Sequence, residues 1–511
     1  MGRSTHRTRL TTDALAVALA LALAASLGPT TARAQTAPTD PLPASGPIPM
    51  LAEPASIVDV VDAFDVAAAW SFRLTAGYQY ESHTATIQRE NGAVADGGLG
   101  VPGLNRIGSY HETTHTLLAN AELGLYHDLA LTFGVPVILS NTREIRQLGD
   151  QGASEGNAAL GDGWSENGHA TSLFTIPSGG VWRAPERSGI DQLRLGIAWA
   201  ILNQQRDRTK PTWLVRFEWR PPVGSVMHAC QATDAGSQVC PAASSVPSIP
   251  AGGSTNATMP AVRPGSSDGP GISRGVHGIY FQTALARRMG YIEPYAGMDV
   301  LAEFPLRSTP FNYFDTPYGQ LLSFPPIQAS LTVGAEIIPW ENRETWQRAV
   351  IDLRIHGTYV SQGRDYSPLY DALGSSNSRA LLQPGCPSNV RNADGSCQPG
   401  RDVYFDGLTA VASHAILGGN LTVSIQPSRF LRFNLGAGLS FATSHVITNT
   451  DACSQNTTVP ASNPEWQGGC VGNRAPDPLH RAVIDSPGQR FVTTDEMYFD
   501  LYASIALTPR F

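Results

Sequence analysis

Charged side chains recur at every second position in several segments of this chain, a spacing that places them on one face of an extended strand. Arginine and carboxylate groups on one such face form either a bracing network of ion pairs or a charged ring that selects a solute. The residue types fit both interpretations, and the sequence leaves both open. Twelve residues are predicted to share this polar face: Arg73, Glu122, Arg194, Arg216, Glu218, Arg220, Asp299, Asp352, Arg354, His356, Arg432 and Asp500.

Catalysis would need a nucleophile and a base on the same face of a strand. The nearest pair is His356 with Ser361, but these positions point to opposite faces of a regular strand. A second set could meet only through folding that the sequence does not specify: His414, His445, Asp451 and Asp495. Zinc, phosphate-loop and EF-hand motifs are absent from the sequence. We therefore predict no enzyme, no cofactor, no metal site and no nucleic-acid partner.

Composition limits the class of protein that carries these residues. The chain has 511 residues, 15% of them charged and 42% hydrophobic, with a net charge of -8, which excludes a coiled coil, a collagen-like rod and a disordered acidic tail. Residues 1–34 are predicted to be a secretory signal peptide, with Arg3 and Arg7 in a basic start, an apolar core and Ala32-Arg33-Ala34 as the cleavage site. Beyond it, no apolar run reaches the roughly 18 residues of a membrane-spanning helix.

The segments that carry the charges alternate with apolar residues at a period of two. In one of them Trp213, Phe217 and Trp219 occupy one face, and Arg216 and Glu218 the other. Such segments are longer than the usual 5 or 6 residues of a soluble strand, and they cover the roughly 9 to 11 residues that cross a bilayer at a tilt. Twelve are predicted: 68–88, 109–126, 129–146, 188–203, 211–226, 274–289, 291–306, 324–340, 347–362, 407–426, 430–446 and 492–511.

Short and long connections alternate between these segments, which is typical of an outer-membrane barrel with periplasmic turns and extracellular loops. The six cysteines fall in predicted long loops, and proximity favours three local disulfides: Cys230 with Cys240, Cys386 with Cys397, and Cys453 with Cys470. The sequence therefore predicts an all-β fold, a transmembrane antiparallel β-barrel of about twelve strands over residues 66–511, in the bacterial outer membrane.

The two ends of the barrel carry further signals. The last segment ends on Phe511, a terminal aromatic residue that resembles the signal by which the barrel-assembly machinery recognises its substrates. Residues 35–65 precede the first strand and are rich in proline and alanine. They are either a periplasmic tail or a plug in the lumen. Expected partners are outer-membrane lipid, the assembly machinery and a small solute that the sequence does not identify.

A family resemblance rests on Gly161-Asp162-Gly163, on Gly189 to Gly196, and on Trp213 to Arg220 followed by Pro221-Pro222-Val223-Gly224. This pattern resembles the meta-pathway phenol-degradation type outer-membrane proteins, relatives of the fatty-acid and aromatic-hydrocarbon uptake channels. The resemblance covers about a third of the chain. It implies passive transport of small, hydrophobic solutes included, with the N-terminal segment as a hatch. The predicted twelve strands differ from the fourteen of the fatty-acid channels.

The sequence thus predicts a monomeric outer-membrane channel for passive transport of small solutes. Two alternatives stay open: a structural or surface-interaction barrel with a closed lumen, and an export pore for a secreted polysaccharide.

Overall fold

The chain divides into two units, residues 1–47 and 48–511, and the residues whose structure can be described belong to the second. The computed structural model describes residues 55–61, 63, 71–91, 103–148, 173, 180–232, 238–240, 249–250, 258–259, 269–306, 309–311, 321–342, 344–376, 381, 405–458, 470, 474–477 and 479–508.

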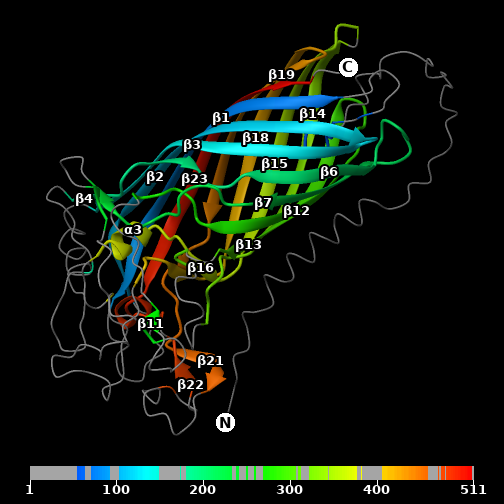
Figure 1. Ribbon diagram of the computed structural model, residues 1–511. Helices are drawn as coiled ribbons and strands as arrows, with labels where there is room; N and C mark the ends of the chain where they lie inside the picture. Colours follow the sequence, from blue (N-terminus) through cyan, green and yellow to red (C-terminus); the bar gives the residue numbers. More distant parts are fainter. Residues whose placement is uncertain are drawn as a thin grey trace, which may run out of the picture. The chain divides into compact units, whose positions relative to one another are not determined.

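Twelve antiparallel strands form a closed barrel (Figure 1), as the sequence predicts. Each strand pairs with its neighbour along the chain, and the first pairs with the last from Leu74 opposite Leu507 to Arg89 opposite Phe491. Closure leaves no exposed edge on this sheet. The wall strands are β1 (Phe72–Asn91), β2 (Gly103–Tyr126), β3 (Leu129–Gln147), β6 (Arg194–Leu202), β7 (Thr212–Arg220), β12 (Val276–Ala286), β13 (Ile292–Pro305), β14 (Gln328–Asn342), β15 (Gln347–Val360), β18 (His414–Ser428), β19 (Leu431–Ala442) and β23 (Phe491–Leu507).

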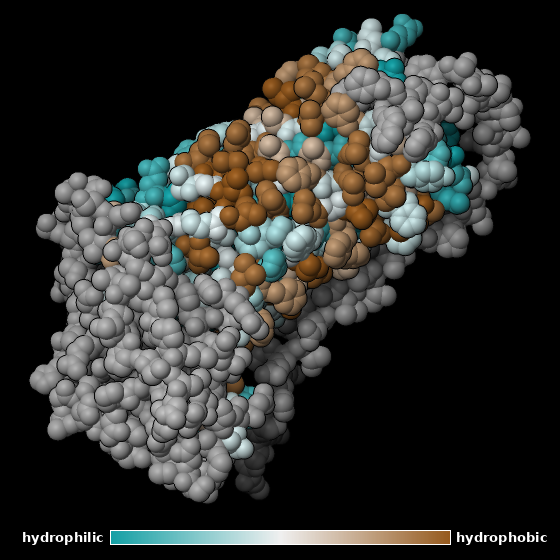
Figure 2. Space-filling model, viewed as in Figure 1, coloured by the Kyte–Doolittle hydropathy of each residue, from teal (hydrophilic) through white to brown (hydrophobic). Residues whose placement is uncertain are grey.

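The outer face of the barrel is apolar. Ile355 is 73% exposed and Leu435 65%, and similar side chains occupy alternate positions on neighbouring strands. Figure 2 shows these apolar side chains gathered over the wall on the face in view. A soluble monomer rarely exposes a continuous apolar surface beyond a few hundred Å². An apolar belt on a closed barrel is instead the architecture of a bacterial outer-membrane protein.

Strand ends follow the local backbone chemistry. The predicted segment 211–226 ends as a strand at Arg220, because Pro221 and Pro222 have no N–H to donate to the sheet. The predicted segment 188–203 begins its wall strand only at Arg194, because its first residues belong to β5 (Arg187–Ile190), a separate short strand that pairs with β3. Both corrections shorten a predicted strand without changing the strand count.

The connections at the two ends of the barrel differ in length. At one end, the short-turn end, they comprise residues 127–128, 203–211, 287–291, 343–346 and 429–430. At the other, the long-loop end, they comprise 92–102, 148–193, 221–275, 306–327, 361–413 and 443–490. Among the described residues, no helix is long and apolar enough to span a membrane.

The long connections carry short elements of their own. Helix α3 (Tyr370–Gly374) and helix α5 (Ala482–Asp485) are both buried for most of their length. The strands are β4 (Val181–Arg183) and β5 (Arg187–Ile190), which extend the sheet at β3, then β8 (Gln231–Ala232), β9 (Gln238–Val239), β10 (Ile249–Pro250), β11 (Thr258–Met259), β16 (Gly363–Asp365), β17 (Thr409–Val411), β20 (His445–Val446), β21 (Cys453–Thr458) and β22 (Arg474–Pro476). We call the described parts of the six long connections the loop layer.

An apolar cluster joins the loop layer to the barrel wall. Ile87 on β1 and Ile107 on β2 are fully buried, and they belong to the same cluster as Trp182, Leu373 and Ile484 from three different long connections. The loops therefore have a common core of their own, which long structureless loops would lack.

Two disulfides hold this layer. Cys230 is bonded to Cys240, with a Cα–Cα distance of 4.3 Å, and Cys453 is bonded to Cys470 at 5.8 Å. Both bonds lie at the long-loop end. The predicted pair of Cys386 with Cys397 lies outside the described residues, as does Phe511.

We expect mild reduction to loosen the loop layer and leave the barrel intact. A disulfide restricts the open ensemble of the loop it closes, so its loss raises the fraction of time that the loop is open. Limited proteolysis with and without reductant should give new cuts in residues 227–273, 363–406 and 447–491. New cuts within the wall strands would contradict the assignment.

Candidate functional site

A segment that precedes the first strand lies inside the barrel. Residues 55–61 and 63, which we call the plug, contact inward-facing residues of β1, β6, β7, β12, β13, β14 and β19. These strands stand on all sides of the barrel, so the segment crosses the lumen. The contacts lie near the short turns. The described part of residues 35–65 thus lies against the inner wall of the barrel.

Two carboxylates of the wall hold the start of the plug. Glu293 on β13 and Glu336 on β14 are opposite one another in register, and both are buried, at 1% and 3% exposed. Glu293 accepts a hydrogen bond from the Ala55 N–H at 2.8 Å, and Glu336 accepts one from the Ser56 N–H at 2.7 Å. Like charges directly opposite on neighbouring strands destabilise a sheet. The plug supplies donors that compensate this cost.

Asp59 connects the plug to two further strands. Its Oδ2 lies 2.6 Å from Arg73 Nη2 on β1 and 3.5 Å from Arg432 Nη1 on β19. Arg73 also contacts Glu122 on β2 at 3.3 Å. The Asp59 side chain is only 13% exposed, so these contacts are partly shielded from water. Hydrogen bonds to charged groups contribute about 1.5–3 kcal/mol each.

Apolar contacts also hold the plug against the barrel wall. Ala55 and Val58 are fully buried against Leu214 on β7 and Ala284 on β12, whose chain neighbours point outward to the membrane. The void that remains beside Ser56, Glu336 and Arg432 has about 10 Å³. That space is close to the smallest that admits one water molecule.

Beyond the plug, the lumen is lined by charged residues of both signs. Arg194, Arg216 and Arg220 come from β6 and β7, whereas Glu81 on β1 and Asp500 on β23 are opposite one another in register. The Arg220 guanidinium lies 4.3 Å from the centre of the Tyr280 ring and 3.0 Å from Glu218. A solute in this belt, which we call the charged belt, is exposed to a transverse field.

The structure places the twelve residues predicted for the polar face as follows. Arg73, Glu122 and Arg432 lie at the plug. Asp352 and Arg354 form an ion pair, and Asp352 also accepts a hydrogen bond from Tyr295 at 2.5 Å. The remaining residues line the belt: Arg194, Arg216, Glu218, Arg220, Asp299, His356 and Asp500.

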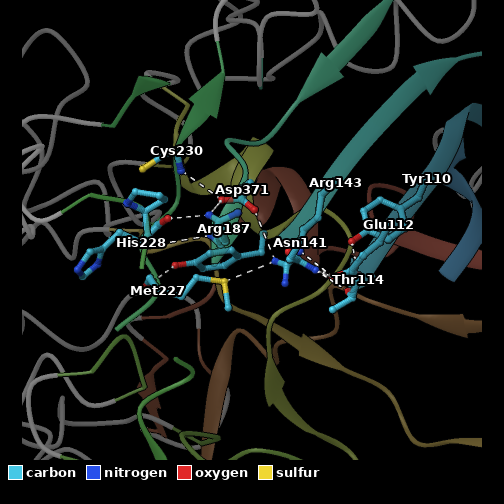
Figure 3. A network of polar contacts seen from close by, with 12 residues as sticks. Tyr110, Glu112, Thr114, Asn141, Arg143, Arg187, Met227, His228, Cys230 and Asp371 are labelled. Carbon is cyan, nitrogen blue, oxygen red and sulfur yellow. Dashed lines mark hydrogen bonds and ion pairs between the residues drawn. The ribbon is translucent and has the colours of Figure 1, made fainter. Parts of the chain in front are cut away.

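A buried polar network ties the loop layer to the barrel wall at the long-loop end (Figure 3). Asp371 on α3 lies 2.5 Å from Arg187 on β5 and 3.6 Å from Arg143 on β3, and Arg143 in turn lies 2.9 Å from Glu112 on β2. The Cys230 N–H donates to Asp371 Oδ1 at 3.2 Å. One aspartate thus joins the barrel wall to three segments of the loop layer.

Burial also changes the acidity of groups in the loop layer. It raises the pKa of Asp485 to about 7, against the opposing effect of the Arg481 N–H and guanidinium. It raises the pKa of Asp406 as well, although Arg364 lies 2.8 Å away and favours the charged form. These two carboxyl groups are therefore buried within the loop layer and not solvated at its surface.

The groups considered for catalysis do not assemble into a catalytic set. His356 Nε2 lies 3.1 Å from Ser440 Oγ, while Ser361 Oγ accepts a hydrogen bond from the Ile327 N–H. The rings of His414 and His445 stack with centres 3.7 Å apart, but Asp495 lies on the surface, 3.9 Å from Arg106.

The sequence analysis missed the residues that hold the plug and those that hold the loop layer. Glu293 and Glu336 occupy polar-face positions next to short turns, and that placement was a usable signal for the plug. Arg187 and Asp371 lie in long loops, 184 residues apart, where no periodicity relates them.

Comparisons with known proteins were made for the whole chain. No protein-family model matches it. No curated protein matches it either. Similar solved structures include a Pseudomonas aeruginosa FadL homologue (8% identity, 92% of this chain and 96% of that chain, TM-score 0.31). Others are the Ralstonia pickettii toluene transporter TbuX (11%, 92% and 99%, 0.26) and the outer membrane protease OmpT from Escherichia coli (6%, 86% and 97%, 0.27). The fold described above comes from the strand pairing of this chain itself.

Proposed function

We propose that this protein is a gated outer-membrane channel for the passive transport of small solutes, with the plug as its gate. The observation that carries the proposal is how the plug is held. Its polar contacts include two backbone hydrogen bonds to Glu293 and Glu336 and the ion pairs of Asp59, which water can replace. A covalent or strand-paired closure would not be displaced in this way.

The charged belt supports the same proposal. A barrel whose only task is to anchor loops has no need for arginine side chains that stay accessible inside it, and Arg194 is exposed there. Charged groups of both signs in the belt favour polar and dipolar solutes over apolar ones in a water-filled lumen. We therefore propose small solutes as the cargo. The charged belt favours polar ones, whereas the sequence resemblance implies that hydrophobic ones are included.

Single-channel conductance in a planar bilayer tests this function. The full chain without residues 1–34 is compared with a chain that also lacks residues 35–65. We expect rare, brief openings from the first and steady openings from the second, because removal of the plug leaves a continuous polar lumen. Silence from both chains would contradict a channel and favour the surface-interaction alternative. Steady openings from both would contradict the gate.

A further inference from the structure

The loop layer contains a cavity of about 190 Å³. None of its described lining residues belongs to the plug. Three long connections build it, through residues 321–322, 362–364, 405–410, 449–455 and 477–485. The Cys453–Cys470 disulfide closes a loop that contributes Gln455 to the lining. For scale, an engineered apolar cavity of about 150 Å³ holds a benzene molecule.

One wall of the cavity is apolar and firmly packed. Phe405, Leu408 and Ile484 line it and are 5%, 2% and 0% exposed. Ile484 and Phe405 belong to the apolar core that joins the loop layer to the barrel. This wall is therefore preformed, as small-molecule sites commonly are.

The other wall has polar atoms without partners. Asp477 is 4% exposed; its Oδ1 accepts a hydrogen bond from the Leu479 N–H at 2.9 Å, and the Leu321 N–H also lies near the carboxyl group. Its Oδ2 has no partner within hydrogen-bond distance among the described residues. The buried Thr409 Oγ1 has none either in this part of the chain. A buried polar atom without a partner costs about 1–3 kcal/mol, and more when it is charged. A ligand that donates a hydrogen bond would recover that cost.

The charge balance around the cavity is negative. Asp406 is matched by Arg364 at 2.8 Å, and Asp485 accepts from the backbone N–H of Arg481, whose guanidinium also lies near. The described lining contains the carboxylates of Asp451, Asp477 and Asp485 against the one guanidinium of Arg364. Asp451 is exposed, and Arg364 and Arg481 also favour the charged form of Asp477. Burial raises the pKa of Asp477 to about 6, so its carboxyl is largely ionised at neutral pH.

We propose that this cavity binds a small organic cation, with an ammonium group at Asp477 and an apolar body about the size of one six-membered ring against Phe405, Leu408 and Ile484. The apolar wall and the unpartnered Asp477 oxygen set the two ends of the ligand. Binding requires the loop layer alone, so the site stands independently of transport through the lumen.

Calorimetric titration of the purified, folded protein with four ligands of matched shape tests the proposal. Benzylammonium should bind, benzyl alcohol should bind at least tenfold more weakly, and toluene and benzoate should give no saturable signal. Equal affinity for benzylammonium and benzyl alcohol would overturn the assignment of a cation. No saturable binding of benzylammonium at millimolar concentration would overturn the site.

Two variants locate the binding. Asp477→Asn should weaken benzylammonium binding at least tenfold, whereas Asp207→Asn, at an exposed position in a short connection, should leave it unchanged. Thr409→Val serves as a second variant that removes the other unpartnered oxygen and should weaken binding severalfold. Circular dichroism and heat-dependent gel mobility check that each variant is folded. Unchanged binding in both folded cavity variants would place the ligand elsewhere.

Discussion

Arg187→Ala is expected to destabilise the loop layer by about 3–5 kcal/mol, because it leaves the carboxylate of Asp371 buried without its main partner. The Arg187 side chain is fully buried and that of Asp371 is 3% exposed, with 2.5 Å between Nη2 and Oδ1. Arg143 is 3.6 Å from the same carboxylate and compensates only in part. The readout is the urea dependence of proteolysis in the long loops of the folded barrel.

Two controls separate the buried charge from general damage. Arg146→Ala removes an arginine of β3, the strand that pairs with β5. Its side chain is 61% exposed, and its loss should destabilise the loop layer by less than about 1 kcal/mol. The double variant Arg187→Met with Asp371→Leu removes both charges and should recover much of the stability. A loss from Arg187→Ala no larger than that from Arg146→Ala would show that the network does not hold the layer.

Asp59→Asn is expected to raise the ratio of open to closed time about tenfold or more in single-channel records. The substitution keeps the size of the side chain but removes the charge that attracts Arg73 and Arg432 across the lumen. A loss of about 1.5–3 kcal/mol from hydrogen bonds to charged groups corresponds to one to two decades in an equilibrium constant. The expectation rests on the proposed function.

The same substitution elsewhere gives the matched control. Asp207→Asn removes an aspartate that pairs with Lys210 at 3.4 Å in a solvated short connection, and it should leave the open time unchanged. If Asp59→Asn opens no more often than Asp207→Asn while the chain without residues 35–65 opens steadily, the plug closes the lumen through its other contacts.

Strand alternation predicted the wall because outward and inward positions have different solvents. Leu353 and Ile355 face the membrane and Asp352 and Arg354 the lumen, and this contrast repeats on every strand. The predicted segment 407–426 shows the limit of the method. Its first part, Thr409–Val411, pairs with β16 in the loop layer instead of the wall, since an alternating pattern fits any two-faced sheet.

The contacts that hold the plug and the loop layer were harder to predict from the sequence. Asp59 meets Arg432 only because the barrel closes and brings β19 beside β1 with β23 between them. Such pairing depends on the register of all twelve strands at once. In the long loops, the apolar residues that form the common core follow no period, so neither the core nor the cavity beside it left a pattern in the sequence.

The carboxylates of Glu293 and Glu336 hold the plug through the backbone N–H groups of Ala55 and Ser56. The side chains of Ala55 and Ser56 take no part in these two hydrogen bonds. The exposed position 56 is therefore free to change over evolution to nearly any residue without loss of this hydrogen bond. Proline is the exception, because it has no N–H to donate. Closely related chains can thus differ at this position and still hold the plug through the same backbone hydrogen bond.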